Sequence, residues 1–371
     1  MRKRYLMRIA FVAPRYGTAF GGVETHVHQL STRMAALGHT VDVLAPENDR
    51  GLPAEECSAG VTIRRFYVPV PTENYAFAPS LGAYLRDHAR TYDIVHAHSY
   101  HRLAALQAAL CSGAPLIFTP HYHGTGHTAW RKLLHVPYRR LGTLIMRRAR
   151  SIICVSSAEA ALVRAHFPHA AARVIVVPNG VDVQALRAAQ PCPETSTVVL
   201  SAGRLESYKR VDLTIKALAH LDSGFVMRIT GDGPARRELE ALVSELALST
   251  RVHFLGAVAE ATLHSYYRSA AVYVSMSNHE AMGITLIEAI VAGSCVVASD
   301  IPAHRETAHG VGAGLVSLIP PLSSPTVLAQ AIQQAADRHA RGALPIPVVA
   351  SWDDVAERTL RIYSTAAGAI L

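Results

Sequence analysis

Short runs of apolar, β-branched residues alternate with helical patterns along the whole chain. In the first half the runs are RIAFVAP, TVDVLAP, DIVHAHS, PLIFTPH, SIICVSS and VIVVPN, and in the second half TVVLSAG, FVMRITGDG, VHFLGA, AVYVSMS and CVVASD. These runs are too continuously apolar for strands with one face in water, so they favour parallel sheets covered on both faces. Between the first two runs, apolar residues recur with the period of a helix that Gly38 ends.

The same alternation occurs twice, which predicts an α/β protein with two doubly wound, Rossmann-like parallel-sheet domains. A length of 371 residues agrees with two domains of ordinary size. We place an N-terminal domain at residues 1–182, a polar, proline-bearing linker at 183–196 and a C-terminal domain at 197–354.

Composition points to a soluble, cytoplasmic protein. No run of about 18 uncharged apolar residues occurs, which argues against a transmembrane helix. The start, MRKRYLMRIAFVAP, has the basic end of a signal peptide, but Arg8 interrupts its apolar part, so we interpret RIAFVAP as the first strand. The five cysteines lack CxxC spacing, which argues against a disulfide framework and a zinc knuckle.

The net charge of +8 arises in one segment of the chain. Residues 94–158 contain no Asp or Glu but eight cations: Arg102, Arg131, Lys132, Arg139, Arg140, Arg147, Arg148 and Arg150. Leucines lie between the basic pairs, and we expect Pro137 to start a helix there. Two interpretations remain open, a solvated helix face and a surface that meets anionic lipid or an anionic acceptor.

In doubly wound sheets, ligands bind beyond the carboxyl ends of the strands, so the residues after each strand carry the candidate chemistry. Gly21 and Gly22 precede a helix, where a diphosphate could approach backbone N–H groups. Arg204 and Lys209 follow the first strand of the second domain and could converge on one anion. The alternative for the two glycines is a tight turn, and the alternative for Arg204 and Lys209, which their placement makes the weaker one, is a pair of ordinary surface cations.

A pair of carboxylates follows a later strand of the second domain. Glu280 lies in the turn NHEAMG, and Glu288 lies about one turn into the helix ITLIEAIVA, which Gly293 closes. Carboxylates are strong acceptors for sugar and ribose hydroxyls, whereas the backbone N–H groups at the start of this helix could hold a diphosphate. Those N–H groups belong to Gly283, Ile284 and Thr285. A carboxylate near a helix N-terminus is also favourable without any ligand, which is the alternative for Glu288.

Several of these segments together resemble the family-four retaining glycosyltransferases of the GT-B fold. The segments are GGVETHVHQLSTRMAALGHTV, VVPNGVD, AGRLESYKRVDLTIKAL, GDGPARREL, HEAMGITLIEAIVAGSCVVASD and SWDDVAERTLRIY, and they run over nearly the whole chain. The most specific feature is the spacing of Glu280 and Glu288 in register with Arg204 and Lys209. The resemblance implies two domains that face a cleft and a final helix, 355–371, that returns to the first domain.

The resemblance also assigns roles to individual residues. Glu280 would contact hydroxyls of the transferred sugar, Glu288 would hold the ribose, and Arg204 with Lys209 would neutralise the leaving diphosphate. His121, in TPHYHG, would lie beside the transferred sugar. The donor-binding set that the resemblance implies is completed by Gly21, Gly22, Gly231, Leu255, Ala257, Met282, Gly283, Ile284 and Thr285. Ala281 and Met282 depart from the family pattern, which has an aromatic residue more often before the glycine.

The resemblance implies a metal-independent transferase that moves a hexose-type sugar from a UDP- or GDP-sugar to an acceptor hydroxyl with retention. No D-x-D occurs in the sequence, so neither a metal site nor a cofactor is predicted. Fixed cations would stabilise the charge that develops on the diphosphate, and no side-chain base would be needed. The acceptor could be lipid-linked or anionic and the product a bacterial glycolipid, polysaccharide or glycosylated metabolite. Peripheral contact with the inner face of an anionic membrane remains one of the two open interpretations of the basic stretch, and no nucleic-acid partner is expected.

Two other functions remain as alternatives. A GT-B-like sugar-nucleotide epimerase would keep the donor contacts and need no acceptor. A metal hydrolase is suggested by HAHSYH and HYHGTGH, whose histidines have H-x-H spacing after predicted strands. No carboxylate lies in that acid-free stretch to complete such a metal site, which argues against the hydrolase.

Overall fold

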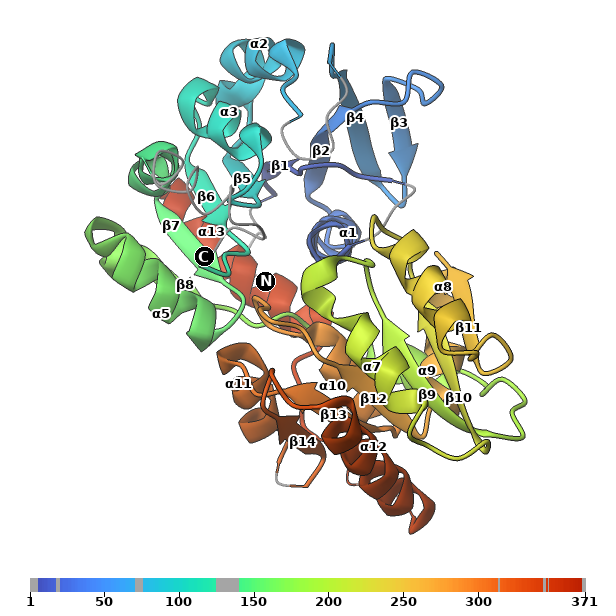
Figure 1. Cartoon of the computed structure of the whole chain (residues 1–371). Helices are drawn as coiled ribbons and strands as arrows, with labels where there is room; N and C mark the ends of the chain where they lie inside the picture. The colour runs from blue at the N-terminus through green and yellow to red at the C-terminus, as the bar shows by residue number, and fades with distance from the viewer. Residues whose placement is uncertain are drawn as a thin grey trace. The chain divides into compact units, whose positions relative to one another are not determined.

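The computed structural model describes residues 6–17, 21–70, 76–124, 140–312, 314–342, 345 and 347–368. The chain forms two compact units (Figure 1). Unit 1 comprises residues 1–180 and 352–371, and unit 2 comprises residues 181–351. Each unit is built around one sheet.

The sheet of unit 1 has the strand order β3-β4-β2-β1-β5-β6-β7-β8. Neighbouring strands are parallel, except that β3 runs antiparallel to β4 at one edge. The strand order reverses between β1 and β5, which makes this position the topological switch point of the sheet. The strands are β1 (Arg8–Val12), β2 (Thr40–Glu47), β3 (Glu55–Ser58), β4 (Val61–Tyr67), β5 (Ile94–His98), β6 (Leu116–Thr119), β7 (Ser151–Cys154) and β8 (Val174–Val176).

Helices cover both faces of this sheet (Figure 1). They are α1 (Gly22–Ala36), α2 (Pro79–His88), α3 (Leu103–Cys111), the helical residues 140–148, α5 (Ser157–His166) and α13 (Trp352–Ala367). The short 3₁₀ segments are η1 (Ala89–Thr91) and η2 (Pro168–Arg173). The face with α2 and α3 encloses a core that includes Leu81, Leu85, Phe118 and Val163.

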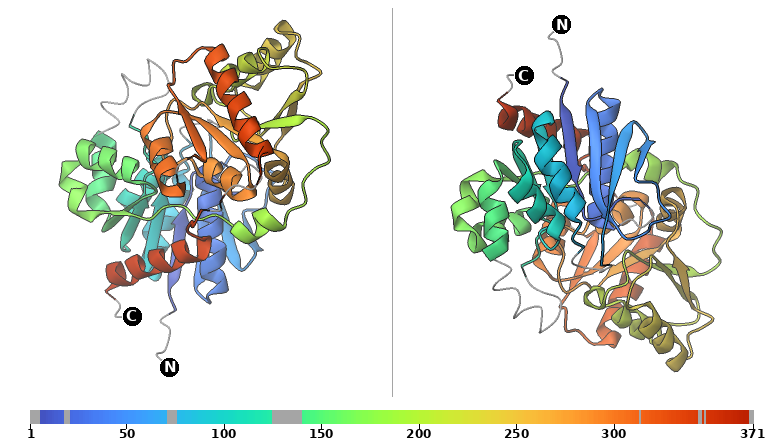
Figure 2. Two further views of the ribbon diagram at one scale, coloured as in Figure 1. Left: turned by 90° about the horizontal axis from the view of Figure 1, so that it is seen from below. Right: turned by 90° about the horizontal axis from the view of Figure 1, so that it is seen from above.

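The C-terminal helix α13 packs on unit 1 beside α1 (Figure 2). Its Tyr363 side chain is fully buried and makes a 2.6 Å hydrogen bond with Nδ1 of His96 in β5. At its start, Trp352 lies edge-on to His26 of α1, with ring centroids 5.7 Å apart. The sequence resemblance implied a returning helix at 355–371, and the helix begins three residues earlier, at Trp352.

The sheet of unit 2 is wholly parallel, with the order β11-β10-β9-β12-β13-β14. Its switch point lies between β9 and β12. The strands are β9 (Thr197–Ala202), β10 (Phe225–Thr230), β11 (Val252–Gly256), β12 (Val272–Ser275), β13 (Cys295–Ser299) and β14 (Val316–Ile319). The helices are α6 (Val183–Ala188), α7 (Val211–Leu218), α8 (Arg236–Glu245), α9 (Glu260–Ser269), α10 (Ile284–Ala292), α11 (Pro302–Val311) and α12 (Pro325–Ala340), with η3 (Ser207–Lys209).

Two hydrophobic cores lie on opposite faces of the unit 2 sheet. Successive side chains of a strand point to opposite faces, and β9 shows this directly. Val199 belongs to the core under α7, α8 and α12, whereas Val198 and Leu200 belong to the core under α6, α9 and α10. The continuous apolar runs in the sequence are therefore strands buried on both faces.

The structure corrects one sequence prediction and adds a detail to another. Residues 183–196 were predicted to be a linker, but residues 183–188 form α6, which Asp182 caps and which packs on α9 and α10 in unit 2. The predicted parallel sheet is present in unit 1, and the hairpin of β3 and β4 adds an antiparallel strand at its edge.

Candidate active site

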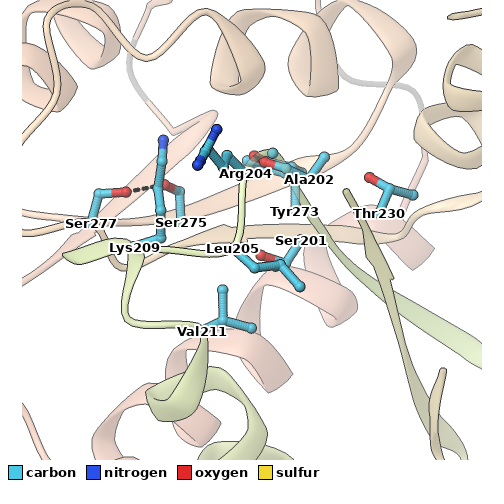
Figure 3. A pocket seen from close by; sticks show the side chains of 11 residues that line it. Ser201, Ala202, Arg204, Leu205, Lys209, Val211, Thr230, Tyr273, Ser275 and Ser277 are labelled. Atoms are coloured by element: carbon cyan, nitrogen blue, oxygen red, sulfur yellow. Dashed lines mark hydrogen bonds between the residues drawn. The ribbon is translucent and has the colours of Figure 1, made fainter. Parts of the chain in front are cut away.

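The candidate site of unit 2 lies at the switch point between β9 and β12. Loops that follow β9, β10 and β12 meet there because parallel neighbours end at the same edge of the sheet. A pocket at this edge is lined by Ser201, Ala202, Gly203, Arg204, Leu205, Lys209, Val211, Thr230, Tyr273, Ser275 and Ser277. Arg204 and Lys209 extend their charged ends to the same side of this pocket (Figure 3). The structure therefore brings the two predicted cations together.

Lys209 forms an ion pair with Glu280, which follows β12. Lys209 Nζ lies 2.5 Å from Glu280 Oε1, and the two side chains are only 22% and 16% exposed. The hydroxyl of Ser277 donates a second hydrogen bond to the same carboxylate oxygen, over 2.8 Å. The carboxylate is thus fixed by one charged and one neutral donor.

Burial and charge act in opposite directions on this pair. Burial by itself would raise the pKa of Glu280, but the Lys209 ammonium and the Ser277 hydroxyl outweigh burial and hold that pKa below its usual value. Burial would likewise lower the pKa of Lys209, but the Glu280 carboxylate raises it above its usual value. Both groups are therefore charged at neutral pH, and removal of either would leave the other as a buried, unpaired charge.

The two loops that carry this pair are also joined by their neighbours. The backbone N–H of Asn278 donates to the carbonyl of Tyr208 over 2.8 Å. The rings of Tyr208 and His279 stack with centroids 4.4 Å apart. These contacts fix the loop after β9 against the loop after β12, so the distance between Lys209 and Glu280 does not depend on the ion pair alone.

Arg204 has a different partner from Lys209. Its Nε donates to Glu206 Oε1 over 2.8 Å, and both side chains are about one third exposed. This exposed pair contributes little to stability. Arg204 keeps further guanidinium N–H groups that could bind an anion in the pocket.

Gly231 supports the Arg204 loop from the strand beside it. Its φ of +104° and its closeness to Gly203 both require glycine, since a Cβ there would lie 2.1 Å from the Gly203 carbonyl oxygen. The backbone carbonyl of the next residue, Asp232, accepts a hydrogen bond from the backbone N–H of Leu205 over 3.0 Å. This geometry gives Gly231 a structural reason to be glycine, beside the donor contact that the sequence predicted.

Helix α10 starts at the same edge with Gly283 as its N-cap. Gly283 has φ +83°, and a Cβ there would lie 3.1 Å from Cδ2 of His304. Glycine has no side chain to cap the helix, so the N–H groups of its first turn, including those of Ile284 and Thr285, need other partners. The preceding Met282 is half-buried, and its carbonyl accepts the hydroxyl of Thr307 over 3.2 Å.

Glu288 lies in α10, where it accepts a hydrogen bond from the hydroxyl of Tyr267 over 2.9 Å. Burial raises the pKa of Glu288 to about 7, although the Tyr267 hydroxyl opposes this rise and the charge of Glu260 adds to it. Glu288 is therefore only partly ionised at neutral pH. Its carboxyl is held ready by one donor and can accept more once ionised.

Leu255 and Ala257 lie at the carboxyl end of the edge strand β11. Leu255 is half-buried, Ala257 is exposed, and Gly256 between them bridges to Gly231. Nearly all predicted donor-binding residues of unit 2 thus lie along one edge of one sheet. Gly21, Gly22 and His121 belong to unit 1.

In unit 1, Gly21 is the N-cap of α1 and Gly22 its first residue. The side chain of Glu24 accepts the Gly21 N–H over 3.1 Å and also pairs with Arg15. A Cβ on Gly22 would meet no atom within 4 Å among the described residues. The start of α1 thus has room beside Gly22, but one of its N–H groups already has a carboxylate partner.

His121 follows β6 in a left-handed backbone conformation, with φ +48°. Non-glycine residues rarely adopt this conformation, and it concentrates at functional sites. The next N–H, that of Tyr122, donates to Glu159 Oε1 over 2.5 Å, and the other oxygen of Glu159 accepts the N–H of Val155 over 2.6 Å. Burial raises the pKa of Glu159 to about 8 against the effect of these two donors. Glu159 thus anchors the backbone that carries His121.

The basic stretch is only partly described. Arg131, Lys132, Arg139 and Pro137 lie outside the described residues. Arg148 donates to the carbonyl of Ser112 over 3.0 Å, and Arg150 donates to that of Ala366 over 2.5 Å. These two carbonyls lie at the C-terminal ends of α3 and α13, where cations are favourable. Two of the eight cations therefore have a structural role.

The sequence did not single out several side chains that shape these sites. They are Tyr208, Tyr267, Ser277, His279 and His304 in unit 2, and His26, Glu159 and Asn179 in unit 1. Ser277 could have been found, since it ends the run AVYVSMS and precedes Glu280 by three residues. The others depend on contacts between elements distant in sequence.

None of the described helices is long and apolar enough to cross a membrane.

Two families match adjoining parts of the chain. Glycosyltransferase Family 4 matches residues 20–185, and Glycosyl transferases group 1 matches residues 182–339. A phosphatidyl-myo-inositol mannosyltransferase of Mycobacterium tuberculosis is 29% identical over 98% of both chains. A D-inositol 3-phosphate glycosyltransferase of Geodermatophilus obscurus is 27% identical over 94% of this chain and 85% of its own.

Solved structures with the same fold extend the comparison. Sucrose-phosphate synthase from Thermosynechococcus elongatus superposes with a TM-score of 0.77 at 21% identity, over 97% of this chain and 98% of its own. Anabaena HepE in complex with UDP and glucose superposes with a TM-score of 0.74 at 19% identity, over 97% of this chain and all of its own. Both likenesses concern the fold of the two α/β units.

Proposed function

The chain belongs to the family-four glycosyltransferases of the GT-B fold, and from this premise we propose that it transfers a hexose-type sugar from a nucleotide diphosphate sugar to a hydroxyl of a phosphorylated inositol, with retention of anomeric configuration. The observation that carries the proposal is the ion pair of Lys209 and Glu280 in the pocket that Arg204 also lines. The acceptor class is supported by two relatives whose names specify phosphatidyl-myo-inositol and D-inositol 3-phosphate.

The cations would act on the leaving group. As the bond between sugar and phosphate breaks, negative charge grows on the diphosphate, and Lys209 and Arg204 would stabilise it more in the transition state than in the bound donor. In the described structure Lys209 is bound to Glu280. The ion pair would therefore keep both charges satisfied until a donor offers the ammonium a phosphate and the carboxylate a sugar hydroxyl.

The remaining donor contacts would come from α10 and the strand ends beside it. Glu288 would accept hydroxyls of the ribose, and the N–H groups at the start of α10 would hold phosphate oxygens. Gly231, Leu255 and Ala257 would lie along the nucleotide at the edge formed by β10 and β11, and Met282 would lie beside the sugar. In unit 1, the space beside Gly22 would accommodate part of the diphosphate.

The transfer would need neither a side-chain base nor a metal ion. In a retaining reaction the acceptor hydroxyl attacks from the face that the diphosphate leaves, and a phosphate oxygen can take its proton. His121 would orient the sugar through a hydrogen bond, which suits a neutral imidazole. Burial holds the pKa of His121 well below its usual value, so this ring is uncharged at neutral pH.

The test is a matrix of donors and acceptors. UDP-glucose, UDP-N-acetylglucosamine and GDP-mannose are each incubated with a soluble inositol phosphate, with phosphatidylinositol vesicles, or with neither. Products are identified by mass spectrometry, and their anomeric configuration by NMR. Glycosylation of an inositol phosphate in either form supports the proposal, and the two acceptor arms distinguish a free metabolite from a lipid headgroup.

Other outcomes contradict the proposal in separate ways. Interconversion of the free nucleotide sugar without acceptor would identify an epimerase. An inverted product would contradict retention. Loss of activity in EDTA with rescue by a divalent ion would contradict metal independence. Transfer only to unphosphorylated acceptors would leave the donor half of the proposal standing and overturn the acceptor half.

A lipid acceptor would also require contact with a membrane. We propose that the protein works in the cytoplasm, and that a lipid acceptor would bring it to the inner membrane face through the exposed Arg140 and Arg147 together with the basic residues before them. Co-sedimentation with vesicles that contain anionic lipid should then weaken as salt rises, because exposed charges are screened within about 10 Å at 0.1 M salt. Failure to bind at low salt would favour the soluble acceptor.

A further inference from the structure

Three histidines from three elements meet at the switch point of unit 1. His26 comes from α1, His98 ends β5, and His121 follows β6. Each offers one ring nitrogen, and these three nitrogens all lie within 4.8 Å of one another. The ring centroid of His26 lies 5.3 Å from that of His98 and 5.2 Å from that of His121. The first two side chains are at most 1% exposed, and His121 is half-buried.

The hydrogen bonds leave ring nitrogens of this cluster without partners. Nδ1 of His26 lies 2.7 Å from Oδ1 of Asn179. Because an amide oxygen only accepts, Nδ1 donates, and Nε2 of His26 therefore has a lone pair. Among the described residues, buried Nε2 of His26, both ring nitrogens of His98 and Nε2 of His121 have no hydrogen-bond partner.

A fourth buried histidine of unit 1 has hydrogen-bond partners for both of its ring nitrogens. His96 lies beside His98, with ring centroids 4.1 Å apart. Its Nδ1 is 2.6 Å from the Tyr363 hydroxyl, and its Nε2 is 2.8 Å from the Thr119 hydroxyl. His96 is thus a structural residue, whereas each of the other three histidines keeps at least one buried ring nitrogen without a hydrogen-bond partner among the described residues.

We propose that His26, His98 and His121 bind a divalent transition-metal ion of the kind that prefers imidazole, with Zn²⁺ as the representative. Zinc bonds to imidazole nitrogen at about 2.0–2.1 Å, so tetrahedral ligand nitrogens lie about 3.4 Å apart. Ring rotations that bring the nitrogens closer by up to about 1.4 Å would complete the site. The hydrogen bond from His26 to Asn179 supplies the outer contact that orients a metal-bound imidazole.

The protonation state of the cluster favours the same ligand. Burial lowers the pKa of His26 to about 4, and it holds the pKa values of His98 and His121 well below the usual value. All three rings are therefore neutral at neutral pH, which is the form that binds metal. The sequence argument against a metal site was that no acid lies within residues 94–158. That argument fails because α1 supplies a third histidine from outside this stretch, and three histidines suffice.

The ion would act as an inhibitor of transfer rather than as a cofactor. It would take the lone pair of His121, the residue proposed to orient the transferred sugar, and would occupy the space beside it. This consequence rests on the proposed function, but the binding of the metal does not. Zinc should thus inhibit transfer reversibly, and EDTA should restore activity.

The decisive measurement is metal binding by the full chain. The metal-free protein is titrated with Zn²⁺ in competition with a chromophoric chelator, and with Co²⁺, whose visible absorption reports coordination geometry. Wild type should bind one ion per chain. His98→Leu should fold, because leucine replaces two unpartnered polar atoms in a buried position, and it should lose this ion. His220→Gln, which changes an exposed histidine of unit 2, should keep it.

Two further variants keep the proposal testable if His98→Leu fails to fold. His26→Gln should abolish the stoichiometric site, and Asn179→Leu should weaken it by about 10–100-fold through loss of the outer contact. Zinc should raise the melting temperature of wild type and of His220→Gln, but not that of His98→Leu or His26→Gln. Equal binding by wild type, His98→Leu and His26→Gln would overturn the proposal, as would the absence of stoichiometric binding by wild type. Metal binding without any transferase activity would support this site and contradict the proposed function instead.

Discussion

At the switch point of unit 2, between β9 and β12, the buried titratable groups include Lys209 and Glu280, which are charged and paired with each other. At the switch point of unit 1, between β1 and β5, they include neutral histidines, three of which have ring nitrogens without a partner in the described part of the chain. The two sheets are both doubly wound, so the backbone plan does not account for this difference. It lies in the side chains that each sheet places at its carboxyl edge.

The difference shows how each unit accommodates buried ionisable side chains. An unpaired buried charge is very unfavourable, so unit 2 keeps its charges only as a pair with an extra donor from Ser277. Unit 1 instead keeps its imidazoles uncharged, because burial lowers their pKa values. Paired charges that can separate suit an anionic diphosphate. Neutral donors and acceptors suit sugar hydroxyls or, as proposed above, a metal ion.

The largest expected effect comes from breaking the charged pair. Lys209→Ala should lower transfer by about 10³-fold or more, because the leaving group loses a charge-assisted contact and Glu280 is left buried without its partner. Lys216→Ala is the matched control, since Lys216 is 42% exposed and pairs only across one turn of α7. Steady-state rates of both variants, with folding checked by circular dichroism, provide the test. A loss below tenfold in Lys209→Ala would remove this residue from the chemistry.

Mutations of the two carboxylates of unit 2 should affect different kinetic quantities. Glu280→Gln should lower kcat by about 10²-fold with little change in UDP or GDP affinity, because its contact is with the sugar. Glu288→Ala should weaken nucleotide binding by about 5–150-fold, as expected for about 1–3 kcal/mol of lost hydrogen bonding. Calorimetry gives the affinities and initial rates give kcat. Equal effects of both changes on both quantities would contradict the assigned division of roles.

In the neutral half, Glu159 should act on stability and on His121 rather than on the diphosphate. Glu159→Gln sets an amide NH₂ against one of the two backbone N–H groups that the carboxyl oxygens of Glu159 accept, which should cost about 1–3 kcal/mol. The melting temperature should fall by roughly 2–10 °C, and KM for the donor sugar should rise while UDP affinity stays constant. Glu240→Gln, on the exposed face of α8, should change neither the melting temperature nor KM. An altered UDP affinity would show that the effect is not confined to unit 1.

Much of this architecture could be predicted from the sequence because its strands are buried on both faces. The eleven apolar runs all contain strands, and the helix predicted at 284–292 has those bounds in the structure. Three strands were not singled out, β3, β4 and β14, and the first two have a different character. Strand β3 is EECS at an edge, with three of its four residues exposed, and β4 carries two arginines, so neither reads as a continuous apolar run. The six residues of α6 are too few for a helical period.

The candidate site was predictable only where its residues are close in sequence or match a family pattern. Glu280 and Glu288 are eight residues apart, and Arg204 and Lys209 follow one strand, so spacing was sufficient to find them. The histidine cluster was not predictable in this way. His26 precedes His98 by 72 residues, and only the adjacency of β1 and β5 in the sheet brings α1 to the end of β5. A pattern of H-x-H pairs suggests a metal but does not identify the third ligand.

The smallest expected effect concerns pH and again distinguishes the two units. Burial raises the pKa of Glu288 to about 7, and only the ionised carboxylate can accept both ribose hydroxyls. Nucleoside affinity should therefore be highest above pH 7 and should fall toward tenfold per pH unit below it, since protonation competes with binding. Uridine is the better probe because its ribose lacks a titrating phosphate, and 2′,3′-dideoxyuridine should show no such dependence. Tyr267→Phe removes the hydrogen bond that lowers this pKa, so the midpoint should move to higher pH. An affinity for uridine that stays flat through neutral pH would contradict the ribose role of Glu288. A midpoint that moves downward in Tyr267→Phe would contradict the cause given for its pKa.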